Sequence, residues 1–289
     1  MLRSWLELAR VSNLPTAWTN VTAAWLLAGG TMIDSRLWMF WLAAGLFYSG
    51  GMILNDAADV AFDREHRPER AIPSGRVTKQ AAWIVGLAML AGGWSVSVLG
   101  GGAQAGVATG LVALILAYDL YHKPWPGAVV VMGACRWFLY LLAGSALLGA
   151  GSDLWEGEVM MRGLALGAYI VGLTLVARQE SKGRSGSGGA QAVARAFLYA
   201  PALLTAWEFM QGGSWEPLVV LPFFAWMAWH AGRMMRRGGA AIGEAVGVLL
   251  AGIAIVDALA VARVSLPLAL GFVATMPLLR LWQRKIAAT

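Results

Sequence analysis

The sequence has 289 residues, of which 58% are hydrophobic and 13% are charged, and its formal net charge is +6. Soluble domains are about half apolar and about a quarter charged, so this composition excludes an ordinary soluble enzyme. Many apolar stretches are long enough to cross a bilayer as helices, which also excludes a β-barrel of short alternating strands. We therefore predict an all-α polytopic membrane protein.

Ten apolar stretches are predicted to be transmembrane helices. In chain order they cover residues 14–31, 37–55, 80–99, 103–121, 127–149, 159–179, 195–211, 216–235, 242–262 and 265–283. Only Arg263, Val264 and Ser265 separate the last two, which form either a tight hairpin or one span followed by an interfacial helix. The prediction is a single domain over residues 1–289 with nine or ten transmembrane helices.

The basic residues gather in alternate loops. They are Arg3 and Arg10 before the first span, Arg64, Arg67, Arg70, Arg76 and Lys79 in the second loop, Lys123 in the fourth, Arg178, Lys182 and Arg184 in the sixth, and Arg233, Arg236 and Arg237 in the eighth. The positive-inside rule places these loops in the cytoplasm. Their charge suits anionic lipid and an acidic substrate. No basic patch interleaved with aromatic residues points to nucleic acid.

The second apolar stretch ends in a group of acidic residues. Asp56, Asp59 and Asp63 have a spacing that places them on one face of a helix, and Asn55 lies one turn before Asp59. Carboxylates this close repel one another unless a cation lies among them. Mg²⁺ prefers oxygen ligands and leaves positions open for phosphate. A solvated acidic helix end is the alternative, but this helix is expected to end in a bilayer.

Four arginines follow the acidic residues within the same loop. They are Arg64, Arg67, Arg70 and Arg76. Guanidinium groups match the oxygen atoms of phosphate, whereas carboxylates suit a dication. The two groups together predict a clamp for a metal-bound diphosphate.

Three motifs resemble the UbiA superfamily of intramembrane prenyltransferases. The first is Asn55-Asp56-x-x-Asp59-x-x-x-Asp63, followed by Arg70-x-Ile-Pro-Ser-Gly75. The second is the segment from Arg10 to Thr16, which resembles the entry to the first helix of the family. The third is Tyr118-Asp-Leu-Tyr-His-Lys123, which is similar to the tyrosine and lysine motif after the fourth helix.

The resemblance implies a helical bundle around a central cavity that is accessible from the lipid. An isoprenyl diphosphate would bind with its tail among the helices and its diphosphate on Mg²⁺ at the cytoplasmic end. Loss of diphosphate would leave an allylic carbocation, which a small or lipid-soluble acceptor attacks. The implied location is the bacterial cell membrane.

The resemblance also assigns roles to individual residues. Catalysis falls to Asp56, Asp59, Asp63 and Lys123, and the three aspartates are also the metal ligands. From the resemblance and from the residues themselves, we predict that the substrate-binding residues are Asn13, Asn55, Arg64, Arg70, Tyr118, Arg136, Arg178, Glu180 and Lys182. Two of these have a simpler alternative, since Asn13 could cap a helix and Lys123 could pair with Asp119. Aromatic faces suited to a carbocation are those of Trp18, Phe47, Tyr48, Trp137 and Tyr140.

The sixth loop departs from the family pattern. The family has a second aspartate-rich motif there, whereas this chain has only Glu180 between Arg178 and Lys182. In one interpretation, Arg178 and Lys182 neutralise the diphosphate in place of a second metal. In the other, the protein binds a polyprenyl lipid or diphosphate, or helps to transport it, without catalysis. The Ala-Arg178-Gln-Glu180 stretch and Cys135-Arg136 are similar to the EboC-like branch of the superfamily.

Arg136 and Asp257 both lie in the middle of apolar stretches. An unpaired charge inside a membrane is costly, so Arg136 should face the interior of the bundle. It forms either a buried ion pair with Asp257 or part of the cavity.

Overall fold

The computed structural model describes residues 2–121, 125–148, 152–181 and 188–284, and the regular elements of this part are helices. The long helices are α2 (Pro15–Leu27), α3 (Arg36–Ala58), α5 (Lys79–Ser95), α6 (Ala105–Tyr121), α7 (Ala128–Leu148), α9 (Glu158–Ser181), α10 (Gly188–Met210), α11 (Glu216–Arg237), α12 (Ala241–Ala251), α13 (Ile253–Val261) and α14 (Leu266–Gln283). The short ones are α1 (Leu2–Leu8), η1 (Val11–Asn13), α4 (Val60–His66), η2 (Val96–Gly100) and α8 (Ser152–Glu156).

Each predicted span coincides with a helix or a helix pair. Within the described residues, six helical stretches are long and apolar enough to cross a membrane, and they are Arg36–Ala58, Lys79–Gly100, Ala128–Leu148, Glu158–Arg178, Ala241–Val261 and Leu266–Gln283. Helix α6 is apolar but shorter, and α2 has only 13 residues. The all-α membrane architecture is confirmed, and the count of nine or ten spans stays a prediction.

The last two predicted spans form a hairpin. Helix α14 packs against α13, and the side chain of Ser265 caps its first turn by accepting a hydrogen bond from the backbone N–H of Leu268. Helix α14 has 18 residues and is apolar enough to cross a membrane, which favours this hairpin over an interfacial helix.

The predicted span 242–262 is broken into α12 and α13 at Gly252. A side chain at this position would collide with Met227 of α11, so glycine lets the two helices approach closely. Tyr169 of α9 donates a hydrogen bond from its hydroxyl to the carbonyl oxygen of Leu249 at 2.7 Å. The break therefore lies at a tight junction of three helices in the core.

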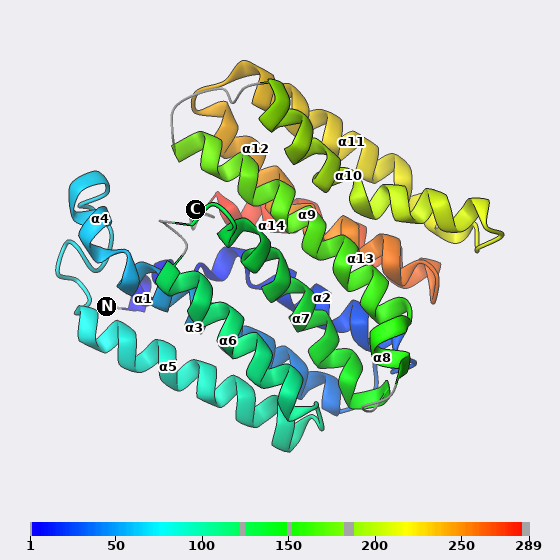
Figure 1. Cartoon of the computed structure of the whole chain (residues 1–289), viewed down its shortest axis with the longest axis horizontal. Helices are drawn as coiled ribbons and strands as arrows, with labels where there is room; N and C mark the ends of the chain where they lie inside the picture. Colours follow the sequence, from blue (N-terminus) through cyan, green and yellow to red (C-terminus); the bar gives the residue numbers. More distant parts are fainter. Residues whose placement is uncertain (1, 122–124, 149–151, 182–187, 285–289) are drawn as a thin grey trace.

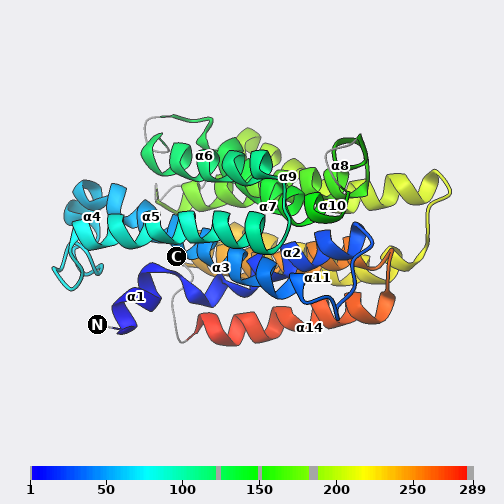
Figure 2. The ribbon, with the colours of Figure 1, turned by 90° about the horizontal axis from the view of Figure 1, so that it is seen from below.

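The two ends of the bundle differ in composition. Helices α1 and α4 lie at one end together with the C-terminal ends of α3 and α6, whereas α8 lies at the other end (Figures 1 and 2). Three polar segments far apart in the sequence therefore meet at the first end, which we call the α1–α4 end.

A buried charge cluster fastens helices at the α8 end. Arg162 of α9 pairs with Glu208 of α10 and donates to the hydroxyl oxygen of Thr205 at 3.0 Å. Arg263, in the turn before α14, pairs with Glu208 at 3.1 Å and with Glu158 at 2.9 Å. Because each charge has an opposite partner, this cluster ties α9, α10 and the final hairpin together.

Candidate active site

A small apolar cavity opens between α3, α6 and α7. Its lining is Phe47, Tyr48, Gly51, Met52, Leu111, Ile115, Tyr118, Asp119, Met132, Cys135, Arg136 and Leu139. Its volume is about 70 Å³. Small-molecule sites usually have about 300 Å³ or more, so a long chain bound here would extend beyond the cavity or displace side chains. Polar groups in the otherwise apolar wall come from Tyr48, Tyr118, Asp119 and Arg136.

Asn55 and Asp119 join the acidic motif to this cavity. The side-chain amide of Asn55 donates to Oδ1 of Asp119 at 3.2 Å, across 64 residues of sequence. The other carboxylate oxygen, Oδ2, is buried and has no hydrogen-bond partner. The end of α6 therefore contributes an acidic group that the sequence motif alone did not include.

The acidic motif is not one continuous helix. Helix α3 ends at Ala58 and α4 begins at Val60, so Asp59 lies between them with φ −83° and ψ 2°. The backbone N–H of Asp59 still bonds to the carbonyl oxygen of Asn55 at 3.0 Å, and that of Asp63 to Asp59 at 2.9 Å. The predicted spacing of one turn is thus kept across a slight break.

Arginine side chains hold two of the three motif aspartates. Nη1 of Arg70 lies 3.2 Å from Oδ1 of Asp56 and 3.0 Å from Oδ2 of Asp63. Nη2 of Arg10 lies 3.2 Å from the same oxygen of Asp56. The cation between Asp56 and Asp63 is therefore a guanidinium group from the following loop, which relieves their repulsion.

Arg10 forms the elbow between α1 and α2. It has φ 45°, a left-handed conformation that is uncommon for a residue other than glycine. Burial acts to lower its pKa, but the charge of Asp56 and the hydrogen bond to it outweigh that effect and raise the pKa above its usual value. Arg10 is therefore held in its charged form beside the acidic motif.

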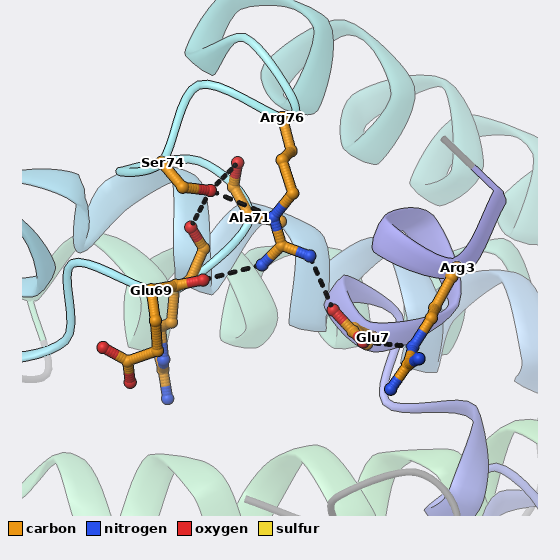
Figure 3. A network of polar contacts seen from close by, with 7 residues as sticks. Arg3, Glu7, Glu69, Ala71, Ser74 and Arg76 are labelled. Carbon is orange, nitrogen blue, oxygen red and sulfur yellow. Dashed lines mark hydrogen bonds and ion pairs between the residues drawn. The ribbon is translucent and has the colours of Figure 1, made fainter.

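A polar network fastens α1 to the loop between α4 and α5 (Figure 3). Glu7 accepts from Arg3 at 3.0 Å and pairs with Arg76 at 3.3 Å. Arg76 also donates to the carbonyl oxygen of Glu69 at 2.7 Å and to the hydroxyl oxygen of Ser74 at 3.0 Å. These contacts are exposed, so they position the loop more than they stabilise the fold.

The network borders an open basin of about 460 Å³. Its lining is Arg3, Glu7, Leu8, Arg10, Asp56, Glu69, Arg70, Ala71 and Arg76. Four arginines thus face three carboxylates around a polar hollow. Asp56 contributes to this basin, whereas Asp119 contributes to the apolar cavity.

Three further predicted site residues are Arg64, Asn13 and Arg178. Arg64 is exposed on α4, apart from the ion pairs of Asp56 and Asp63. Asn13 is buried before α2, and its Oδ1 accepts from the amide of Gln283 in α14 at 2.9 Å. Arg178 donates to the carbonyl oxygen of Pro126 at 3.0 Å, and its charge acts on Tyr118.

Three predicted site residues are only partly described or not described. Lys123 and Lys182 lie outside the described residues, and so does the alternative pairing of Lys123 with Asp119. Glu180 lies in α9, and its side chain is outside the described part. Their predicted roles stay predictions.

Arg136 belongs both to the cavity and to a buried polar network. Its guanidinium donates to Oδ1 of Asn20 at 2.7 Å and to the hydroxyl oxygen of Thr16 at 3.1 Å. Asn20 in turn donates to Oδ2 of Asp257 at 2.7 Å, and Tyr140 donates to Oδ1 of Asp257 at 3.0 Å. The predicted partnership of Arg136 and Asp257 is therefore relayed by Asn20 of α2.

Two of the five aromatic residues expected near a carbocation line the cavity, namely Phe47 and Tyr48. The guanidinium carbon of Arg136 lies 5.3 Å from the centre of the Tyr48 ring. Trp18 instead donates to the carbonyl oxygen of Trp41, and Tyr140 is engaged with Asp257. Trp137 and Tyr140 are absent from the described lining and pack within the core.

Sequence reasoning did not place Arg10, Asn20 or Asp119 in the site. Arg10 and Asp119 lie within stretches that resemble family motifs. The sequence feature that could have identified them is their charge beside the other residues of those motifs. Asn20 had a weaker signal, a lone amide in an apolar helix.

The residues around Asn55 suit a hard dication in charge and in ligand type. No cluster of three or more His, Cys, Asp or Glu side chains that could bind a metal occurs within the described ranges. Mg²⁺, however, usually takes only one or two carboxylates from a protein and completes its shell with water and phosphate. Asp119 could supply one such carboxylate, because its buried Oδ2 has no hydrogen-bond partner and it lies beside Asn55.

Arg70→Ala is expected to lower the free energy of unfolding by about 1.5–3 kcal/mol, because it removes charged hydrogen bonds to Asp56 and to the buried Asp63. Unfolding in mixed detergent micelles measures the change. The control is Arg64→Ala, which removes an exposed arginine of α4 and should change stability by less than about 0.5 kcal/mol. Equal effects of the two variants would show that Arg70 does not hold the loop.

Comparison with known proteins adds to this geometry. Residues 14–251 match the UbiA prenyltransferase family. A digeranylgeranylglyceryl phosphate synthase of Methanopyrus kandleri is 30% identical over 234 residues, covering 76% of this chain and 83% of that enzyme. The enzyme of the same name from Methanoculleus marisnigri is 29% identical, and the match spans 61% of this chain and 60% of that relative.

A solved structure has the same fold. The apo structure of a UbiA homologue from Aeropyrum pernix K1 has a TM-score of 0.66 at 19% identity, covering 86% of this chain and 96% of that one. The helices thus define an integral, multi-pass membrane protein with a UbiA-like fold. The chain belongs to the UbiA prenyltransferase family.

Proposed function

We propose that this protein transfers a geranylgeranyl group from its diphosphate to a glyceryl phosphate-type acceptor within the membrane. The observation that carries the proposal is the apolar cavity between α3, α6 and α7, whose polar wall includes Asp119 in contact with Asn55 of the acidic motif. An apolar tail and a metal-bound diphosphate require this combination of surfaces. The choice of acceptor rests on the two relatives named above.

The reaction breaks the bond between C1 of the prenyl chain and the diphosphate oxygen, and the electron pair leaves with pyrophosphate. The allylic cation that remains forms a bond with a hydroxyl oxygen of the acceptor, which then loses its proton to water. Phe47 and Tyr48 present aromatic faces to the cavity where that cation would form. Apolar neighbours such as Leu111 and Ile115 keep water from the cation.

Mg²⁺ is typical of this family, and when bound it offsets the charge that develops on the departing pyrophosphate. Asn55 and Asp59 are our candidates to hold it. Asp56 and Asp63 contribute in another way, because they orient Arg70 and Arg10 toward the same region. Guanidinium groups so placed can contact phosphate oxygens. Lys123, Arg178 and Lys182 are further cations proposed for the diphosphate.

The arginine-lined basin suits the phosphate of the acceptor. Arg10 and Arg70 line this basin and could contact an anion there, since Asp56 uses only part of their hydrogen-bonding capacity. The α1–α4 end carries this basin and is the end that we propose to face the cytoplasm. We also propose a bacterial cell membrane, nine or ten spans in one domain, and the EboC-like branch for this chain.

The proposal is tested with the purified protein, labelled geranylgeranyl diphosphate, Mg²⁺ and geranylgeranylglyceryl phosphate. We expect release of pyrophosphate and a product that carries the label, both dependent on Mg²⁺ and on the acceptor. A matched reaction without acceptor measures simple hydrolysis. Binding of the diphosphate without release of pyrophosphate, with this acceptor and with alternative acceptors, would instead support a lipid-binding protein that lacks transfer activity.

A further inference from the structure

We propose that Asp119 is a ligand of the Mg²⁺ ion at the diphosphate site, together with Asn55 and Asp59. The inference rests on the proposed function, because it concerns the same site. Asp119 lies outside the aspartate-rich motif and comes from a different helix, α6. It would replace an acidic group that the sixth loop of this chain lacks.

The unpartnered oxygen of Asp119 carries this inference. The residue is 4% exposed, and its Oδ1 accepts the hydrogen bond from Asn55. Its Oδ2 is buried with no hydrogen-bond partner. Within the described parts of the chain, no basic side chain forms an ion pair with Asp119. A buried carboxylate oxygen left in this way is costly, and a bound cation would remove that cost.

Neighbouring groups complete a suitable set of oxygen ligands. Asn55 touches Asp119, and Asp59 follows Asn55 by one helical turn. The charge of Asp59 acts on the Asp119 carboxylate. Two carboxylates and one amide oxygen are about what Mg²⁺ takes from a protein when phosphate fills the remaining positions.

Two other acidic groups at this end already hold arginines. Asp56 and Asp63 hold Arg70, and Asp56 also holds Arg10. In the last turns of α9, the charge of Arg178 acts on Tyr118, the residue that precedes Asp119. A carboxylate on α6 therefore offers the metal a negative charge that no arginine neutralises by an ion pair within the described residues.

The test measures binding of Mn²⁺, a paramagnetic substitute for Mg²⁺, to the full-length protein in detergent by electron paramagnetic resonance of the free ion. Asp119→Asn keeps the size of the side chain and an oxygen for Asn55, but it removes the negative charge. We expect its Kd for Mn²⁺ to rise by about tenfold or more. The control Glu65→Gln removes an exposed carboxylate of α4 at the same end and should leave the Kd within about twofold.

A second variant gives a readout that a purely structural role would not produce. Asp119→Cys places a thiolate at the site, and thiolates prefer soft metals. We expect tighter Cd²⁺ binding relative to Mn²⁺ than in the wild type, together with thiolate-to-Cd²⁺ charge-transfer absorbance. Cys135 is present in both proteins, so the wild type is the background.

The outcomes separate the two proposals. If Asp119→Asn binds Mn²⁺ as tightly as the wild type, or if Asp119→Cys gains no Cd²⁺ signal, Asp119 is not a ligand. Mg²⁺-dependent prenyl transfer by the wild type would then leave the proposed function standing. If the wild type binds no Mn²⁺, the assignment of Asp119 is overturned together with the metal-dependent function.

Discussion

Asp59→Ala is expected to lower the rate of pyrophosphate release from geranylgeranyl diphosphate by about 10³-fold. The proposed metal site contains few carboxylates, so the loss of one removes a large share of the charge that holds the ion. A reduction of about 4 kcal/mol in transition-state stabilisation corresponds to that factor. Initial rates with saturating acceptor and a range of Mg²⁺ concentrations measure the effect.

The control for this prediction is Glu65→Gln. Glu65 is an exposed carboxylate of α4, a few residues beyond Asp59. The Glu65→Gln substitution changes the charge at the same end of the bundle without altering the cavity lining. The rate should therefore stay within about twofold of the wild type. If Asp59→Ala is no slower than Glu65→Gln, Asp59 neither binds the metal nor orients the diphosphate.

Asp257→Ala is expected to have the largest effect on stability, a loss of about 3–5 kcal/mol in the free energy of unfolding. Asp257 is fully buried and accepts hydrogen bonds from Asn20 and Tyr140. Its removal leaves both donors without a partner and leaves the charge of Arg136 uncompensated. Reversible unfolding in mixed detergent micelles measures the change. The loss should also disturb the cavity, because Arg136 lines it.

Two comparisons test this explanation. Asp34→Ala also removes a carboxylate paired with an arginine, but the Asp34–Arg36 pair is partly exposed, so the loss of stability should be much smaller than for Asp257→Ala. In a double-mutant cycle, Arg136→Ala and Asp257→Ala together should cost less than the sum of the single variants, by about 1–3 kcal/mol. Strict additivity would mean that Asn20 does not couple the two charges.

The sequence predicted the helices well, because the bilayer sets a length and a composition that can be read locally. The boundaries of α3 and α7 differ from the predicted stretches 37–55 and 127–149 by a few residues. The break at Gly252 was not foreseen, since it depends on the approach of Met227 from another helix. The helical spacing of the acidic motif was nearly correct, apart from the break at Asp59.

Only the tertiary structure shows which residues far apart in the sequence contact one another. Asp56 meets Arg10 across 46 residues, and Asn20 meets Asp257 across 237. The apolar helices have little amphipathic character, so periodicity could not tell which face of each turns inward. The alternative considered for Asp119 was a local pair with Lys123, and only the packing of α6 against α3 shows that Asp119 also lies beside Asn55.

The sequence by itself determined the class of this protein, a helical membrane protein of the UbiA family with an acidic motif at the end of a span. The length of an apolar stretch and the spacing of residues in a motif are local properties, so they can be read from the sequence without knowing how the helices pack. Only the tertiary structure decided which charges are used to hold the chain together and which face the cavity. Asp56 and Asp63 hold arginines, whereas Asp119 keeps one oxygen unpaired, because helix rotation and side-chain direction select the neighbours of each carboxylate.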